Sequence, residues 1–173
     1  MSTFDLNPKG TYLVPSTFGS DSMALLDMLQ KDGVSPIVLF FNYQTEDSID
    51  KEEKLMAAYC KNHNLTLEIR KAEGSHNAAK DEGFQAWSRE ARYDFFAEMY
   101  KKYDATALIL AHTLEDFLEA YLISKSGQRN EQKYGFARMF VWNNMLIYRP
   151  LLEFTHIDMI HYDHNNKVPF SEH

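Results

Sequence analysis

Short apolar runs alternate with longer segments of helical spacing along most of the chain. The runs cover residues 11–14, 36–41, 65–70 and 106–111, and polar or turn residues bound each of them. Such runs are typical of strands in a parallel sheet that is covered on both faces. Between them, apolar residues recur every three or four positions over residues 22–31, 48–62 and 82–103, which predicts helices. This order predicts an α/β fold with a doubly wound, mostly parallel sheet and right-handed crossovers.

The last third of the chain predicts a different arrangement. A further helix is expected over residues 114–124, followed by a polar loop over residues 127–135. Residues 139–148 carry two apolar stretches around the pair Asn143 and Asn144, and asparagine suits the positive φ angles of a tight hairpin turn. A last helix is expected over residues 154–166.

Composition narrows the class of protein. At 173 residues with 45% hydrophobic residues, the chain is long enough to bury one substantial core. It has no apolar run of the length that a membrane span needs and no signal pattern at its start, so we expect no membrane association and a cytoplasmic location. The single Cys60 excludes an internal disulfide or a cysteine cluster. A net charge of −7 argues against a broad basic surface.

The first predicted strand runs through a turn of small polar residues directly into an apolar helix. The first N–H groups of a helix have no partner within the helix, and the helix dipole adds positive charge there, so this arrangement favours a bound phosphate group. The turn follows neither the G-x-x-x-x-G-K-[ST] pattern nor the G-x-G-x-x-G pattern. The candidate phosphate-binding residues are Thr17, Gly19, Ser20, Asp21 and Ser22.

A second group of polar residues follows the strand predicted at residues 106–111. Asp116 and Glu119 are three positions apart, so on a helix both carboxylates share one face. Two such groups suit an ammonium group or a magnesium ion. The alternative is an ordinary solvated helix start, where acidic residues interact favourably with the helix dipole. The histidines and aspartates of residues 156–164 have no fixed zinc spacing, which leaves any metal site unassigned.

Several segments resemble known motifs in the correct order. Residues 17–22 resemble the Ser-Gly-Gly-x-Asp-Ser pyrophosphate loop of N-type ATP pyrophosphatases, with Thr17 in place of the serine. Residues 112–119 resemble the His-His-x-Asp-Asp-Gln-x-Glu-Thr motif of tRNA(Ile)-lysidine synthases. The segments 41–43, 85–96, 148–152 and 157–169 resemble further parts of that family, including its Arg-x-x-Arg-Tyr helix and its Arg-Pro-Leu-Leu signature.

The resemblance implies a sheet of the adenine-nucleotide alpha-hydrolase-like (PP-loop ATPase) type. It also implies an enzyme that uses ATP and Mg2+ to adenylate the wobble cytidine of tRNA(Ile) and then joins free lysine to it. The ATP site would contain the five residues of the turn together with Arg92 and His112. Asp116 and Glu119 would take the catalytic role at the lysine. Arg89, Lys125, Arg129 and Lys133 would contact tRNA, although the last three also suit an ordinary solvated loop.

The sequence also departs from this pattern. Phe18 stands where the family has a glycine, so we expect a positive φ angle there and a phosphate cradle narrowed by the ring. Thr113, Glu115 and Phe117 replace a histidine, an aspartate and a glutamine.

The chain stops where the family continues. Residues 1–173 are therefore expected to form a single N-type ATP pyrophosphatase-like domain without the C-terminal part of the family architecture. A partner that completes the site, either an oligomer of this chain or another subunit, is compatible with this expectation. Two alternatives stay open. One is an inactive nucleotide-fold protein or partner subunit, and the other is an ATP pyrophosphatase that acts on another acceptor.

Overall fold

The computed structural model describes residues 4–44, 47–72, 83–125 and 137–172. All the predicted strands and helices are present within these residues. In chain order they are β1 (Tyr12–Pro15), α1 (Ser20–Lys31), β2 (Ile37–Asn42), α2 (Asp47–Asn62), β3 (Leu67–Lys71), α3 (Phe84–Lys102), β4 (Ala107–Ile109), α4 (Leu114–Lys125), β5 (Met139–Trp142), β6 (Met145–Tyr148) and α5 (His156–Asn165). The helix α1 begins two residues earlier than the pattern predicted, so the turn before it is shorter.

The six strands form one sheet in the order β3-β2-β1-β4-β6-β5. All neighbouring strands are parallel except β5, which pairs antiparallel with β6 at one edge. The predicted α/β fold with a mostly parallel sheet is therefore confirmed. The hairpin is also confirmed, because Asn143 and Asn144 have φ angles of 51° and 60°, as a two-residue type I′ turn requires.

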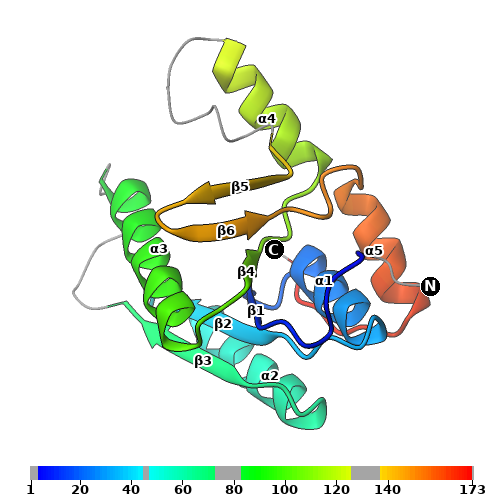
Figure 1. The fold of residues 1–173 in the computed structure, drawn as a ribbon. Coiled ribbons are helices and arrows are strands. Elements are labelled where there is room, and N and C mark those ends of the chain that lie inside the picture. Colours follow the sequence, from blue (N-terminus) through cyan, green and yellow to red (C-terminus); the bar gives the residue numbers. More distant parts are fainter. Residues whose placement is uncertain (1–3, 45–46, 73–82, 126–136, 173) are drawn as a thin grey trace.

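Alternating side chains of the central strands divide the core into two layers. Val14 and Phe40 point to the face that α1, α2 and α5 cover, where Met23, Met56 and Met159 are buried beside them. Leu13 and Leu39 point to the opposite face, against Phe95 and Met99 of α3. Figure 1 shows α3 on one side of the sheet and α1 and α5 on the other. This three-layer packing explains the continuous apolar runs of β1 and β2.

The order of the strands reverses direction at β1. From β1 the chain crosses first to β2 and β3 on one side, and later to β4 and β6 on the other. Loops that leave the carboxyl ends of β1 and β4 therefore separate in opposite directions and leave a crevice between them, the usual place for a ligand in an open parallel sheet.

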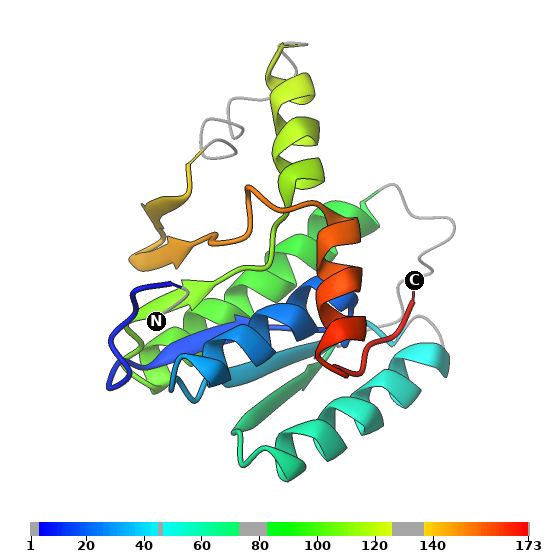
Figure 2. The same cartoon turned by 90° about the vertical axis from the view of Figure 1, so that its right-hand side faces the viewer.

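The helix α4 follows β4 and projects away from the other elements, as Figure 2 shows. Its side chains Leu118 and Leu122 are exposed. Among the described residues, no helix combines the length and the apolar character needed to cross a membrane.

Asp163 is a fully buried acid at the contact between α1 and α5. Within the described residues, neither of its carboxyl oxygens has a hydrogen-bond partner. Burial raises the pKa of Asp163 to about 7, and the nearby carboxylates of Asp21 and Asp27 act in the same direction. The protonated acid is therefore favoured in the folded protein.

We expect Asp163 to make folding stability depend on pH. Since its pKa is higher in the folded protein than the ordinary value of 3.8, its contribution is fully present below pH 4 and is lost as the pH rises through 7. Asp163→Asn should unfold less readily than the parent at pH 8, by on the order of a few kcal/mol. Chemical denaturation at several pH values measures this difference. The exposed Asp94→Asn is the control, and identical pH profiles of Asp163→Asn and parent would contradict the assignment.

Candidate functional site

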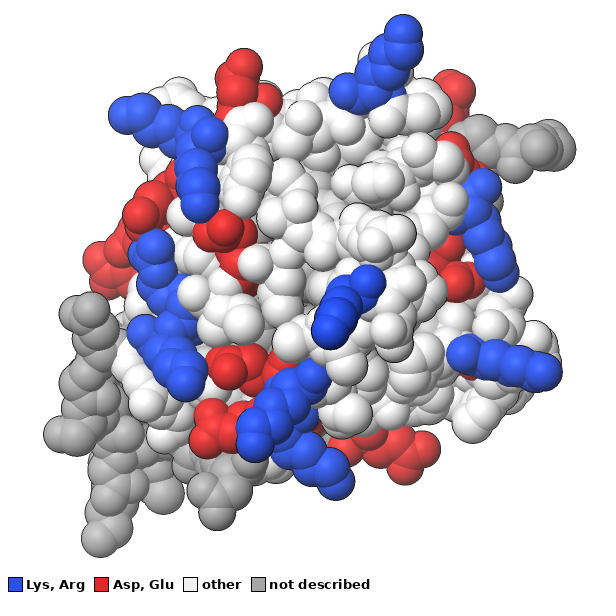
Figure 3. All heavy atoms as spheres, turned by 90° about the horizontal axis from the view of Figure 1, so that it is seen from below, with Lys and Arg blue, Asp and Glu red and all other residues white. Residues whose placement is uncertain are grey.

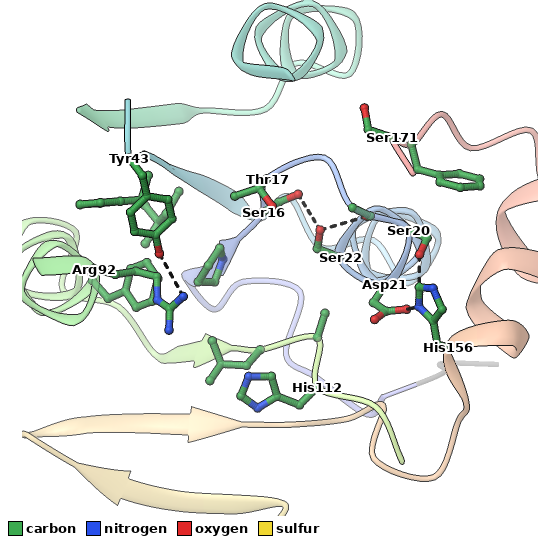
Figure 4. Close-up of a pocket in the computed structure, with 18 of the residues that line it drawn as sticks. Ser16, Thr17, Ser20, Asp21, Ser22, Tyr43, Arg92, His112, His156 and Ser171 are labelled. Atoms are coloured by element: carbon green, nitrogen blue, oxygen red, sulfur yellow. Dashed lines mark hydrogen bonds and ion pairs between the residues drawn. The ribbon is translucent and has the colours of Figure 1, made fainter. Parts of the chain in front are cut away.

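A cavity of about 710 Å3 lies at the carboxyl ends of β1, β2 and β4. Figure 4 shows the start of α1 near its centre, Arg92 and His112 on one side and His156 on the other. The wall combines the turn after β1, the ends of β2 and β4, the middle of α3 and the start of α5. All seven residues that sequence analysis assigned to ATP border it: Thr17, Gly19, Ser20, Asp21, Ser22, Arg92 and His112.

The turn between β1 and α1 leads directly into the start of a helix. Gly19 is the N-cap of α1. Because glycine has no side chain, it cannot cap the first N–H groups of the helix. The hydroxyl oxygens of Ser16 and Ser22 lie 2.7 Å apart, and the Phe18 N–H donates to Ser16 Oγ over 3.1 Å. These bonds hold the turn in shape. Ser16 was not among the residues predicted to bind phosphate, although its position directly after β1 indicated a place in the turn.

Phe18 has the expected positive φ angle, 70°. Its ring, however, is only 4% exposed and belongs to the core layer that α1 and α5 cover. The ring is absent from the cavity wall, which Thr17 and Gly19 line on either side of it. The expectation that the ring narrows the cradle is therefore wrong, because the left-handed backbone turns the side chain into the core. The Phe18 carbonyl accepts a hydrogen bond of 2.8 Å from the Ser171 N–H.

Arg92 and His112 lie on the opposite wall. Arg92 donates to the hydroxyl oxygen of Tyr43 over 3.1 Å. The pKa of His112 is lowered to about 4, first by burial and then by the positive charges of Arg149, Arg92 and Arg89. The ring is therefore neutral near pH 7 and able to accept a hydrogen bond. Sequence analysis used Arg149 only as part of the Arg-Pro-Leu-Leu signature, although the structure places it close enough to act on His112.

The third side of the cavity comes from α5. Nδ1 of His156 lies 2.9 Å from Asp21 Oδ1 and 3.5 Å from Ser20 Oγ. The His156 backbone N–H donates to Glu115 Oε2 over 2.9 Å. Burial raises the pKa of Asp21, while the hydrogen bond from His156 opposes the rise. The sequence indicated His156 only as one of several histidines near aspartates. No local pattern relates it to Asp21, which lies 135 positions earlier in the chain.

Asp116 and Glu119 do not line the cavity. Asp116 accepts a 2.7 Å hydrogen bond from the Thr113 N–H and so helps to begin α4, as the helix-start alternative described. It is nevertheless close enough for its negative charge to act on the pKa values of Asp21 and His112, in the upward direction. Glu119 is exposed on α4. Their role at a lysine stays a prediction.

Two of the four residues predicted to contact tRNA, Arg89 and Lys125, lie among the described residues. Arg89 is exposed on α3, and its guanidinium carbon lies 5.8 Å from the centre of the Tyr93 ring. Lys125 ends α4, while Arg129 and Lys133 lie outside the described residues. On the face that Figure 3 shows, the described Lys and Arg residues alternate with Asp and Glu and form no continuous basic patch.

Residues 5–173 match the PP-loop domain family, and the chain belongs to that family. Over 99% of its length it is 30% identical to a tRNA(Ile)-lysidine synthase of Mycoplasma mycoides, covering 43% of that protein. It is 33% identical to the corresponding protein of Mesoplasma florum, over 88% of this chain and 38% of that protein. The chain thus spans roughly two fifths of the length of these curated relatives.

Two solved structures share the fold. The U34-tRNA thiolase NcsA from Methanococcus maripaludis matches with a TM-score of 0.80 at 10% identity, over 96% of this chain and 60% of that one. NMN synthetase from Francisella tularensis matches with a TM-score of 0.60 at 12% identity, over 94% of this chain and 63% of that one. These likenesses confirm the predicted fold, and the match to the PP-loop domain family confirms the type of the sheet.

Phe18→Gly should destabilise the protein without improving nucleotide binding. Loss of a buried phenylalanine costs about 3–5 kcal/mol, while relief of the positive φ angle returns about 1–3 kcal/mol. We therefore expect a net loss of about 2 kcal/mol in the free energy of unfolding, measured by denaturant titration. Phe154→Ala, which removes a more exposed ring, should cost less. An increase in ATP affinity of the folded Phe18→Gly variant would mean that the ring does obstruct the site.

Proposed function

We propose that this chain binds ATP with its phosphates at the turn between β1 and α1. The observation that carries the proposal is the cavity itself, in which the start of α1 faces Arg92 and His112. Backbone N–H groups and the helix dipole on one side, and the Arg92 guanidinium group on the other, suit a chain of phosphates. Membership of the PP-loop domain family supports this choice.

The residues present also suit a magnesium ion that arrives with the nucleotide. Among the described residues, no group of three or more His, Cys, Asp or Glu is placed to hold a metal by itself. Mg2+ is commonly held by one or two carboxylates together with substrate phosphates, and Asp21 offers one carboxylate in the cavity wall. When bound, the ion neutralises charge on the phosphates.

The reaction that these features support best is that of a tRNA(Ile)-lysidine synthase. In it, the wobble cytidine attacks the α-phosphate of ATP and pyrophosphate leaves. The ε-amine of lysine then displaces AMP and loses a proton. The names of the curated relatives support this substrate set, and the proximity of Asp116 to the cavity supports a place for the lysine ammonium beside α4. We place the protein in the cytoplasm, where a further subunit or copy of the chain contributes contacts to tRNA.

The two alternatives remain distinguishable. The inactive alternative relied partly on Phe18, whose ring does not border the cavity, so this support is withdrawn. The alternative with another acceptor is tested by comparing AMP release in the presence of lysine and of ammonia.

The double variant Asp21→Ala and Ser22→Ala should weaken ATP binding in the presence of Mg2+ by tenfold or more, about 1.4 kcal/mol. It removes a carboxylate and a hydroxyl group from the start of α1, where the phosphates are proposed to bind. Isothermal titration calorimetry measures the affinity. Glu90→Ala, an exposed change on α3, should behave like the parent. Equal affinities of the double variant and the parent would place ATP elsewhere.

Asp116→Asn should abolish lysine-dependent release of AMP while leaving ATP binding largely intact. The amide keeps an oxygen for the Thr113 N–H, so α4 still begins normally, but the charge that attracts an ammonium group is lost. AMP is measured with ATP, Mg2+, tRNA(Ile) bearing the CAU anticodon and lysine, and Asp94→Asn is the control. Equal release by variant and parent would remove the lysine assignment. Release by the parent with ammonia but not lysine would favour another acceptor, and ATP binding without any release would favour the inactive alternative.

A further inference from the structure

The hairpin of β5 and β6 carries an exposed aromatic residue beside the cavity. Trp142 is the last residue of β5 and is 38% exposed. The centre of its ring system lies 5.2 Å from the centre of the Tyr93 ring on α3, with the two planes 78° apart. Tyr93 itself borders the cavity, and Figure 1 shows the hairpin next to α3. Trp142 therefore continues the wall of the cavity towards the surface.

Guanidinium groups surround this aromatic pair. Arg89, Arg92 and Tyr93 share one face of α3, because they lie three and four positions apart. The guanidinium carbons of the two arginines are 5.8 and 5.6 Å from the centre of the Tyr93 ring. Arg149, directly after β6, is close enough to Tyr93 for the phenol to act on its pKa. We call Arg89, Tyr93, Trp142 and Arg149 the aromatic rim.

The aromatic rim carries positive charge in a protein whose net charge is −7. The charged groups that act most on the neighbouring His112 are three arginines and one acid, Asp116. The acids Glu90 and Asp94 of α3 each lie one position after a rim residue, and so about 100° further round the helix. This local excess of arginine favours a ligand that carries phosphate groups.

The combination of flat rings and guanidinium groups suits a nucleotide whose base is not paired. Unpaired bases stack on aromatic side chains and on arginine, while the same arginines neutralise the phosphates beside them. In the proposed reaction, a base that reacts inside the cavity is joined through its backbone to neighbours that stay outside. The aromatic rim is a surface next to the cavity on which such a neighbour can stack.

A purely structural role accounts poorly for Trp142. The hairpin is packed onto the core by Met145 and Ile147 of β6, each only 1% exposed. The turn that follows is formed by the two asparagines with positive φ angles. An edge-to-face contact leaves part of the indole ring uncovered, as the exposure of Trp142 shows. That uncovered surface adds nothing to the packing of the hairpin.

We propose that the aromatic rim binds an unpaired nucleotide of an RNA strand, with its base stacked on Trp142 and its phosphates beside Arg89 and Arg149. This inference rests on the proposed function, because the bound nucleotide is a neighbour of the one that reacts. Since the faces of paired bases are hidden, the aromatic rim selects a single-stranded loop over a duplex.

The first test uses the fluorescence of Trp142. The protein has two tryptophans, so Trp87→Phe leaves Trp142 as the one that emits. An RNA stem-loop with the anticodon CAU in its loop should quench this emission, because a stacked base lies in contact with the indole ring. An RNA duplex of the same length should leave the emission nearly unchanged. Should Trp87→Phe fail to fold, quenching in the parent but not in Trp142→Phe gives the same result.

The second test compares affinities for the same stem-loop, measured by fluorescence anisotropy of labelled RNA. Trp142→Ala should bind about tenfold more weakly than the parent, and Trp142→Phe, which keeps a flat ring, should lose less. Arg89→Gln should weaken binding and reduce its dependence on salt. Val141→Ala, an exposed change on the same strand, is the control and should follow the parent. ATP affinity, measured by calorimetry, should be the same in all these variants.

The outcomes separate this inference from the proposed function. Unchanged Trp142 emission together with intact ATP binding would overturn the inference alone. Equal losses of RNA and ATP affinity in Trp142→Ala would make Trp142 a support for Tyr93 and would also overturn it. Emission that changes with protein concentration and not with RNA would assign the aromatic rim to a second copy of the chain instead. Absence of both ATP and RNA binding by the parent would overturn the inference and the proposed function together.

Discussion

The parallel pairing of β1 with strands on both of its sides is the constraint on which the site depends. Because β1 pairs with β2 on one edge and β4 on the other, the chain must leave the ends of β1 and β4 in opposite directions. The first departure delivers the start of α1, and the second delivers His112. The two core layers bury β1 on both faces, and the turn to α1 leaves directly from the carboxyl end of this buried strand.

The charges around the cavity are arranged unequally. Burial, together with the positive charges of Arg149 and of the arginines of α3, lowers the pKa of His112 and keeps its ring neutral. Carboxylates gather where α1, α4 and α5 meet. Under the proposed function, a phosphate chain with a magnesium ion suits such a division, because its negative oxygens would meet Arg92 and the helix start while the ion would reduce the repulsion from the acidic side.

Phe18 illustrates how a departure from a sequence motif is absorbed. The residue takes the left-handed backbone that the turn requires, and such strain persists only where the surroundings hold it. Here burial of the ring stabilises the turn from behind, and the bond from Ser171 fixes its carbonyl. A bulky residue at a glycine position therefore anchors the turn to the core instead of filling the site.

The sequence by itself determined the strands, the helices, the turn at Asn143 and Asn144 and the phosphate-binding character of the turn after β1, because periodicity and backbone preference depend on neighbouring residues. The positive φ angle of Phe18 and the place of Arg92 and His112 followed from the resemblance of the sequence to known motifs. Only the tertiary structure decided that the Phe18 ring points inward, that Asp116 and Glu119 lie outside the cavity wall, and that Ser16 and His156 belong to it. Those outcomes depend on how α4 and α5 pack against elements distant in sequence, and no local pattern encodes contacts between residues as far apart as Asp21 and His156.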